Sequence, residues 1–460
     1  MITEPDLPKA PAGLFRSRSW QVAMIGLGTA TAQLDTSVNV AFPAITRGFD
    51  LGIADIQWVV ICYVLTFASL LLALGRVGDT VGHAVVFRVG LVWSATALLL
   101  VACSPSYGAM LGFRCLQGVG AALVLSCGAA LVTSLYGEER RSRALGVYTM
   151  MMAIGWMLGP LLGGALTAIW DWPAVFWFRM PIAVAALLLL RGLPVSAPRQ
   201  AGDRFDIIGG IALVLGLVTM LLALNRVREF SAVWFALLSA AAFFAFVVRE
   251  KRAVRPIIAI DILRLPGFAL LNLVSVLANL AAFSVWLLVP YLLARVPGYA
   301  LVGSGAILAA AAAGAVLAAP IAGRFVGRSI SAERLAIMGT VAIGAGLLLI
   351  STWTEQTPTA LRVAGLIVQG VGLGLFQLAY SDIVTAALPL RDRGVAGSLV
   401  LLTRTLGTVT AASIVLMAFE ILQHHHSFLE AFQRTFQLAA LLAFAAAGLL
   451  AFSPRRIGAS

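Results

Sequence analysis

Asp35 is the residue of this 460-residue chain whose surroundings most strongly suggest chemistry. It lies in the stretch QLDTSVNVAFP, roughly 23 Å into a helix that would start near residue 20, at ~1.5 Å per residue. A carboxyl group enclosed by apolar residues is a candidate proton carrier, because it can exchange a proton when its surroundings change. Asn39 lies four residues further on and shares its helix face. The alternative is a structural hydrogen-bond network at the end of that helix.

Two arginines lie inside apolar runs, where a cation needs a partner. Arg114 stays charged at any relevant pH, so it must face a polar cavity or a carboxylate. We expect it to control proton exchange at Asp35, and the alternative is a structural pair with Asp35 or with backbone carbonyls. Arg404 lies about 17 Å from residue 393 at ~1.5 Å per residue, near the middle of its run. It is the second cation that we expect at a cavity.

Polar side chains recur at helical spacing in two further runs. Such stripes favour a cavity between helices that binds a small molecule, although hydrogen bonds between helices explain them equally well. We therefore expect one substrate cavity, built by residues from both parts of the chain. Its predicted lining residues are Asn39, Gln117, Asn272, Asn279, Gln369, Gln377, Tyr380 and Arg404, and Ser275 lies on the same stripe as Asn272 and Asn279.

The segment GWMLGPLLGG carries glycines at close-packing spacing with a proline among them. Small residues four apart let two helix backbones approach closely, and proline adds a kink. Packing is the physical role of these residues under any interpretation, and we expect them to let two helices slide. The set comprises Gly155, Gly159, Pro160, Gly163 and Gly164.

Several classes of chemistry lack their residues in this sequence. We find no phosphate-binding loop with a lysine, no nucleophile–base pair and no cluster with metal-ligand spacing. His424, His425 and His426 are expected in a solvated external loop rather than at a metal. The cysteines Cys62, Cys103, Cys115 and Cys127 are interpreted as small apolar residues. The chain is therefore not expected to be an enzyme or to hold a cofactor.

The composition shows which elements must position these residues. The chain is 61% hydrophobic and only 11% charged, whereas a soluble domain is about 25% charged. A helix of about 20 apolar residues spans the hydrocarbon layer. The sequence therefore predicts an all-α membrane protein with fourteen spans and no soluble domain. The predicted spans are 20–43, 54–74, 84–103, 107–134, 144–168, 174–192, 207–225, 231–248, 267–293, 301–322, 334–352, 359–386, 394–419 and 431–452.

The net charge of +12 is distributed in a way that argues against nucleic acid as a partner. With fourteen spans, 23 of the 32 basic residues fall on one side of the membrane and seven on the other. This asymmetry follows the positive-inside rule and predicts that both termini are cytoplasmic. The first 19 residues are polar and no cleavage site follows, so we expect the first span to stay as an anchor.

An internal repeat divides the chain into two halves. The sequence Gln117-Gly118-Val119-Gly120 recurs as Gln369-Gly370-Val371-Gly372, which is 252 residues further on. Each half then holds six helices in the same order, as in many secondary transporters. The predicted parts are a tail 1–19, a first half 20–193, a linker 194–264 with two extra peripheral helices, a second half 265–453 and a tail 454–460.

These motifs resemble the major facilitator superfamily and, within it, the fourteen-helix drug:proton antiporters. GWMLGPLLGG is similar to the antiporter motif of helix 5, FRCLQGVGAAL to the helix 4 motif with its membrane arginine, and LDTSVNVAFPAI to the helix 1 signature. GRVGDTVGH, which holds Gly75, Asp79, Gly82 and His83, resembles the loop between helices 2 and 3. In this sequence Thr80, His83 and Ala84 stand where the family carries basic residues.

The resemblance implies a role for that loop and a function for the chain. Asp79 would hold the inner side of the two halves together, against Arg140 or Arg141 and the start of the helix near residue 394. The implied function is proton-coupled export of small amphipathic molecules by alternating access, with drug efflux as the commonest case. A dedicated exporter of one metabolite or lipid remains the alternative, and a receptor or structural membrane protein is the alternative from another class. We expect a monomer in the bacterial cytoplasmic membrane that binds lipid, protons and its substrate.

One departure from the family bears on the substrate. WDWPAVFWFRMPI resembles the entry to helix 6, but Arg179 stands where asparagine is usual, and we place it at the outer mouth. Together with Arg114 and Arg404, it predicts a preference for anionic, zwitterionic or neutral amphipaths over permanent cations. The alternative is that protein partners already neutralise these arginines and the cavity is indifferent to charge.

Overall fold

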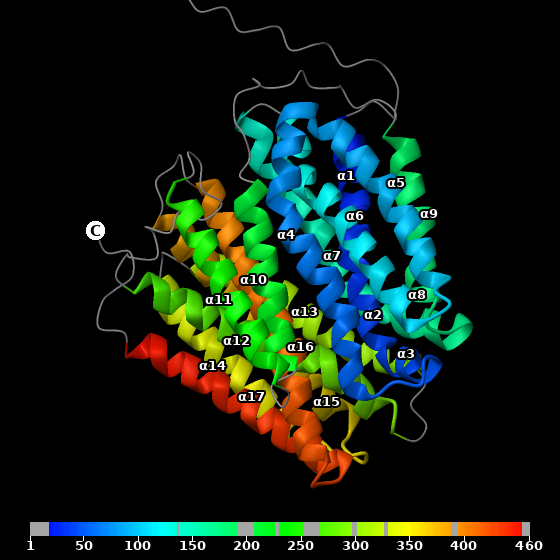
Figure 1. Cartoon of the computed structure of the whole chain (residues 1–460), viewed down its shortest axis with the longest axis vertical. Helices are drawn as coiled ribbons and strands as arrows, with labels where there is room; N and C mark the ends of the chain where they lie inside the picture. The colour runs from blue at the N-terminus through cyan, green and yellow to red at the C-terminus, as the bar shows by residue number, and fades with distance from the viewer. Residues whose placement is uncertain are drawn as a thin grey trace, which may run out of the picture.

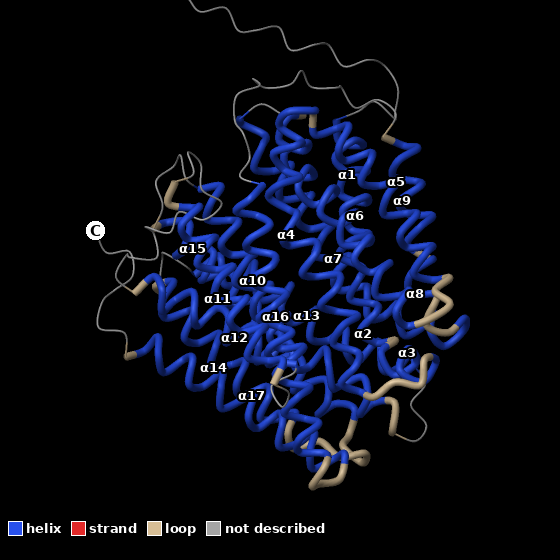
Figure 2. Tube along the Cα trace, viewed as in Figure 1, coloured by secondary structure: helices blue, strands red, loops and turns tan. Residues whose placement is uncertain are grey.

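Helices, most of them long and apolar, account for all the regular secondary structure in the residues that the computed structural model describes (Figure 2). These residues are 18–135, 138–190, 207–225, 230–252, 267–296, 301–325, 330–387 and 393–452. Eleven helices among them are long and apolar enough to cross a membrane, and two more apolar helices, Ala174–Leu189 and Ile208–Met220, are shorter. The expected all-α membrane fold is confirmed, while the exact number of fourteen spans stays a prediction.

The N-terminal half contains a broken first helix and several long ones. Its elements are α1 (Arg18–Gln33), η2 (Leu34–Thr36), α2 (Ser37–Val40), α3 (Phe42–Gly48), η3 (Ile53–Ile56), α4 (Gln57–Val81), α5 (His83–Ala102), α6 (Tyr107–Ser134), α7 (Glu138–Trp170), α8 (Ala174–Trp177) and α9 (Arg179–Leu189).

The inserted pair and the C-terminal half follow. Their elements are α10 (Ile207–Asn225), α11 (Ser231–Glu250), α12 (Phe268–Leu293), α13 (Leu301–Phe325), α14 (Ala332–Ile350), α15 (Thr359–Ala386), α16 (Arg393–Gln423) and α17 (Phe428–Ala451). Serine side chains cap the starts of α6, α14 and α17, where an oxygen accepts from a free backbone N–H.

The two halves repeat the same helix packing. Helix α6 packs against α4 and α5, and its repeat partner α15 packs against α13 and α14. Gly118 allows the close approach of α6 to Tyr63 and Thr66 of α4, and Gly370 allows that of α15 to Ala311 of α13. Glycines at the repeated positions therefore serve the same contact in each half, because only a residue without a Cβ fits there.

The halves meet along two related seams, α7 against α13 and α4 against α16 (Figure 1). The contacts of α12 with α2 and α3, and of α16 with η3, lie at the end of the bundle away from Arg18, where α1 begins (Figure 1). The halves are thus closed against each other at this end. Helix α10 contacts both α4 and α16, so the inserted pair lies outside the bundle and also covers one seam.

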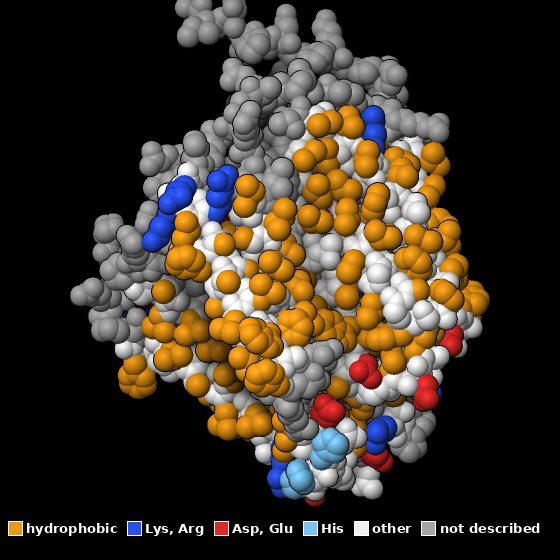
Figure 3. Space-filling view, in the orientation of Figure 1, with side chains coloured by type: hydrophobic (Ala, Val, Ile, Leu, Met, Phe, Trp, Pro, Cys, Tyr) orange, Lys and Arg blue, Asp and Glu red, His pale blue; other side chains and the backbone are white. Residues whose placement is uncertain are grey.

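The surface has the distribution expected of a protein surrounded by lipid. Hydrophobic side chains cover most of the visible face, and acidic and histidine side chains gather at its lower end (Figure 3). Large apolar residues such as Ile208, Trp234 and Leu441 are exposed on helix faces. Because soluble proteins seldom expose such continuous apolar surface, lipid is the medium that this face fits.

The helix boundary near residue 80 differs from the expected one. The predicted loop GRVGDTVGH is mostly helical, because α4 continues to Val81 and α5 begins at His83. The turn is the single residue Gly82, whose φ of 106° suits glycine but strains other residues. The side chains of Asp79, Arg140 and Arg141 lie outside the described residues, so their expected contact stays a prediction.

Candidate functional site

A break in the first helix places Asp35 in the interior of the protein. Helix α1 ends at Gln33, and Asp35 lies in the single 3-10 turn before α2. The hydroxyls of Thr31 and Thr36 donate to the carbonyls of Gly28 (2.6 Å) and Gln33 (3.3 Å), a pattern that competes with regular helix. Thr36 also donates to the Trp156 carbonyl of α7 at 3.0 Å, which holds the break against the neighbouring helix.

The Asp35 carboxylate accepts four hydrogen bonds from three side chains. Arg114 donates to both of its oxygens, from Nη1 to Oδ1 at 2.9 Å and from Nη2 to Oδ2 at 3.0 Å. Gln117 Nε2 and Arg179 Nη1 each donate to Oδ1 at 2.9 Å. The paired geometry with Arg114 is the bidentate arrangement that makes arginine–carboxylate interactions strong. Asp35 is therefore a member of a cluster and not an isolated acid.

Arg114 is fixed by more contacts than the ion pair alone. Its Nε donates to the Val59 carbonyl of α4 at 2.9 Å, and its Nη1 also donates to Gln117 Oε1 at 2.7 Å. The guanidinium lies over the ring of Tyr63, 4.4 Å from the centroid, which stabilises a buried cation. Arg114 therefore links α4, α6 and the helix break into one unit.

Arg179 is in a different place from the one that we expected. It lies at the start of α9 and is completely buried, not at an outer mouth. Its Nε donates to the Val175 carbonyl at 3.0 Å, and its Nη2 has no hydrogen-bond partner among the described residues. One carboxylate thus faces two guanidinium groups, and the cluster of Asp35, Arg114 and Arg179 carries one net positive charge.

The two arginines are expected to contribute unequally to stability. Arg114→Leu removes four hydrogen bonds and should cost about 3–5 kcal/mol, the range for breaking a buried pair. Arg179→Leu removes two hydrogen bonds and an unsatisfied Nη2, and it leaves Asp35 bound to Arg114, so its cost should be smaller. Thermal unfolding in detergent measures both, and an equal or larger loss for Arg179→Leu would contradict this cluster geometry.

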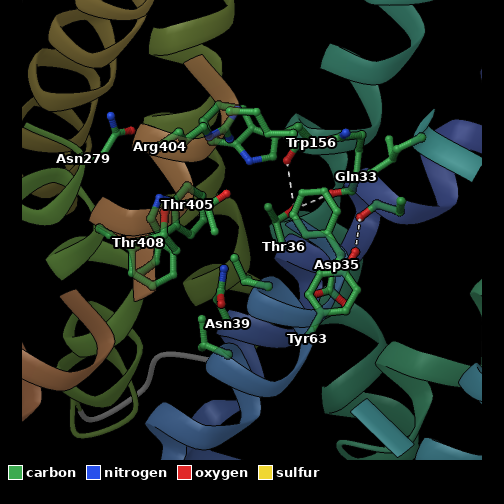
Figure 4. Close-up of a pocket in the computed structure, with 18 of the residues that line it drawn as sticks. Gln33, Asp35, Thr36, Asn39, Tyr63, Trp156, Asn279, Arg404, Thr405 and Thr408 are labelled. Atoms are coloured by element: carbon green, nitrogen blue, oxygen red, sulfur yellow. Dashed lines mark hydrogen bonds between the residues drawn. The ribbon is translucent and has the colours of Figure 1, made fainter. Parts of the chain in front are cut away.

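Asp35 and Arg114 face a cavity between the two halves (Figure 4). Its volume is about 380 Å³, at the lower end of the ~300–1,000 Å³ typical of small-molecule sites. In Figure 4, Asp35, Gln33 and Tyr63 lie on one side and Arg404, Asn279 and Thr408 on the other. Its polar lining residues are Gln33, Asp35, Thr36, Asn39, Tyr63, Arg114, Asn279, Gln377, Arg404, Thr405 and Thr408.

The predicted cavity residues separate into two groups. Asn39, Asn279, Gln377 and Arg404 line this cavity. The other four predicted residues are buried in hydrogen bonds elsewhere, so the alternative of structural bonding fits them better. Gln117 binds Asp35, Gln369 donates to the Ala282 carbonyl at 3.5 Å, and Tyr380 donates to Asn272 Oδ1 at 2.8 Å.

Tyr380 and Asn272 belong to a polar network inside the C-terminal half. The Tyr380 hydroxyl lies 3.0 Å from Thr403 Oγ1, and Ser275 Oγ donates to Thr403 at 3.1 Å. This network joins α12, α15 and α16, and Asn272 and Tyr380 are almost completely buried. The stripe of Asn272, Ser275 and Asn279 therefore connects helices over most of its length and reaches the cavity at Asn279.

The glycine–proline segment of α7 packs against two different partners. Gly159 and Gly163 lie against Thr36 and Ser37, at the helix break of the same half. Gly164 lies against Leu301 and Gly305 of α13, in the other half; a Cβ on Gly164 would be 3.0 Å from the Gly305 Cα. One face of the segment thus supports Asp35, and the other forms the seam between the halves.

Several residues that line the cavity were not predicted from the sequence. Trp156 of α7 and Trp286 of α12 pack across the halves, with ring centroids 5.8 Å apart at 55°, and Phe283 lies beside them on the cavity wall. Trp156 could have been found, because it lies inside the glycine–proline segment. Thr405 and Thr408 follow Arg404 at one and four positions, and this spacing was a signal that could have predicted them.

Comparisons with known proteins agree on one family. The family model described as Major Facilitator Superfamily matches residues 25–249. The puromycin resistance protein pur8 of Streptomyces alboniger is 30% identical over 422 residues, which cover 87% of this chain and 82% of that protein. The riboflavin transporter RibZ of Clostridioides difficile (strain 630) is 25% identical over 454 residues, which cover 95% and 98%.

The fold is also that of solved transporters. A POT family transporter in complex with 5-aminolevulinic acid has a TM-score of 0.72 to this structure, at 11% sequence identity. The match covers 96% of this chain and 97% of the other. At 11% sequence identity, the match supports a shared fold only.

Proposed function

Because this chain belongs to the major facilitator superfamily and is a membrane transporter, we propose that it is a proton-coupled exporter of small amphipathic molecules. The observation that carries the proposal is the Asp35 cluster on the wall of the central cavity. Its carboxylate is bound to arginines yet faces the space where a substrate would enter. The Asp35 carboxyl group can therefore exchange a proton with the cavity. Its protonation state also affects the contacts that Arg114 and Arg179 make at the break in the first helix.

The coupling follows from the charges of the cluster. Protonation of Asp35 removes its negative charge and weakens both ion pairs, because charge-assisted hydrogen bonds lose strength when the acceptor is neutral. Arg114 and Arg179 then repel each other without compensation. The cluster has one arrangement with Asp35 ionised and a different preferred one with Asp35 protonated, and such a two-state element is what alternating access requires.

The conformational cycle would use the two seams between the halves. In this structure the halves are closed where α7 meets α13 and where η3 meets α16. Opening at this end requires the α7–α13 contact at Gly164 to separate, with the halves rocking about the central cavity. Proton binding at Asp35 is expected to accompany the state that is open to the outside.

Export of drugs is supported by one relative, which is called a resistance protein. The alternative, a dedicated transporter of a single metabolite, is favoured by the other relative, which is called a riboflavin transporter and spans nearly the whole chain. The apolar and aromatic lining of the cavity fits amphipathic molecules of either kind.

The position in the cell is part of the proposal. We place the chain in the bacterial cytoplasmic membrane, with both termini in the cytoplasm, as a monomer. The acidic and histidine residues at the lower end in Figure 3 then lie outside, and most arginines lie inside, as the positive-inside rule requires.

Flux measurements in proteoliposomes test the proposal directly. With riboflavin and puromycin as probes, an imposed pH gradient should drive uptake of at least one compound and should release protons that a pH-sensitive dye detects. Collapse of the gradient with a protonophore should stop the flux. Uptake that continues at the same rate without the gradient would contradict proton coupling.

A further inference from the structure

Arg404 is a cation of the cavity that no described acidic residue pairs with. It projects from α16 into the cavity, and its side chain is exposed there (Figure 4). Among the residues that the structure describes, it has no hydrogen-bond or ion-pair partner. A charged side chain inside a membrane-spanning bundle normally pairs with an opposite charge or with backbone carbonyls, and Arg404 has no such partner among the described residues.

The other charges of the cavity cannot supply that partner. Asp35 is the acidic residue of the described lining, and its oxygens already receive bonds from Arg114, Arg179 and Gln117. That cluster itself has a surplus of one positive charge. The cavity as a whole therefore presents positive charge on both of its walls.

The surroundings of Arg404 fit the remainder of an organic anion. Thr405 and Thr408 offer hydroxyl groups beside it, and Asn279 and Gln377 line the same half of the cavity. The pair of Trp156 and Trp286 spans the two halves and provides an aromatic wall, with the two rings tilted toward each other. Aromatic side chains of this kind bind planar rings well.

We propose that the transported substrate is an organic anion with an aromatic body, whose oxyanion binds Arg404 while its ring packs against Trp156 and Trp286. The proposal rests on the proposed function and names its substrate class. Arginine presents a planar fork that matches a carboxylate or a phosphate, and such a pair is stronger in a cavity lined largely by apolar side chains than in bulk water. A permanent cation would meet repulsion from both walls.

Export of an anion would also use the membrane potential. An inside-negative potential drives negative charge outward, so antiport of one anion against one proton moves two charges in the favourable direction. Flux of the anion should then increase when an inside-negative potential is imposed on right-side-out vesicles without a pH gradient.

Equilibrium binding tests the substrate class without any transport. The probes are 2-naphthylacetate, 2-naphthylacetamide and 2-naphthylmethyltrimethylammonium, which share a ring system and differ in charge. A fourth probe, 2-naphthyl phosphate, distinguishes a carboxylate from a phosphate. Quenching of tryptophan fluorescence in purified protein reports binding, and we expect the acid to bind at least about tenfold tighter than the amide.

Variants of Arg404 assign that preference to its side chain. Arg404→Gln should lower affinity for the acid to that for the amide and leave the amide unchanged. Arg404→Lys should keep part of the preference, because it retains the charge but loses the planar fork. Arg334→Gln, at an exposed position at the start of α14, is the matched control and should change nothing.

Two results would overturn the proposal. One is binding of the trimethylammonium probe as tightly as the acid. The other is an acid preference that survives in Arg404→Gln. These outcomes are separate from failure of the proposed function: anion binding without gradient-driven flux refutes proton coupling alone, and gradient-driven flux of the cationic probe refutes the substrate class alone.

Discussion

Asp35→Asn is expected to reduce gradient-driven transport to the level of empty proteoliposomes. Asparagine keeps the size of the side chain and one acceptor oxygen, but it binds no proton in the physiological range. The coupling described above depends on a charge that appears and disappears at this position. Uptake of the probe compounds under an imposed pH gradient, with the amount of inserted protein measured by blotting, gives the result directly.

The control for this variant has to separate coupling from folding. Asp35→Asn leaves Arg114 and Arg179 buried without a counter-charge, and removing one partner of a buried pair costs about 3–5 kcal/mol. The double variant Asp35→Asn with Arg179→Gln restores the net charge of the cluster to its original value. It should recover thermal stability but not transport, whereas Asp50→Asn, at an exposed turn, should affect neither. Transport by the double variant at the normal rate would refute the proton-carrying role.

The sequence was sufficient for the membrane fold because lipid imposes its rules on every span. A run of apolar residues such as 107–134 must be helical to satisfy its backbone, and α6 occupies those same residues. The repeat at an offset of 252 likewise corresponds to a repeated packing, because glycine is the one residue that allows such close backbone contact. Both inferences depend on the types of residue along the chain, namely apolar runs and repeated glycines, and these can be identified from the sequence alone.

The partners of the polar residues could not be predicted in the same way. Helical spacing shows which residues share a face, but not whether that face meets a cavity or another helix. Asn39 and Asn279 reach the cavity, while Asn272 and Tyr380 bind each other across helices. Cavity-facing residues can be distinguished from helix-bonding ones only when the rotation of α12 relative to α15 is known, and no short sequence motif predicts that rotation.

Arg179 illustrates the same limit for charges. It follows a turn at the end of α7 in sequence, and that position suggested an outer mouth. The short helix α8 turns the chain back into the protein, and a residue 144 positions from Asp35 becomes its partner. An ion pair so distant in sequence leaves no trace in local spacing, and only the departure from the family pattern marked the residue.

Gly164→Leu is expected to stop transport by preventing closure of the halves at the end that the proposed orientation places outside. The new side chain would meet the Leu301 carbonyl and the Gly305 backbone of α13, so the contact seen in this structure could not form. Overpacking of this kind costs about 1–3 kcal/mol or more, and that amount shifts a two-state equilibrium roughly 5- to 150-fold. Gly305→Leu adds a side chain to the same contact from the α13 side and should have the same effect.

Cysteine labelling measures the shift independently of transport. In a background in which the native cysteines are replaced by alanine, Asn39→Cys places a thiol on the cavity wall that is nearly buried in this closed form. A membrane-impermeant maleimide added outside should label it faster in Gly164→Leu than in the unmodified background. Gly112→Leu is the matched control, because a Cβ there would meet no atom within 4 Å. If Gly164→Leu and Gly112→Leu show the same labelling and the same transport, the α7–α13 seam is not the contact that opens and closes.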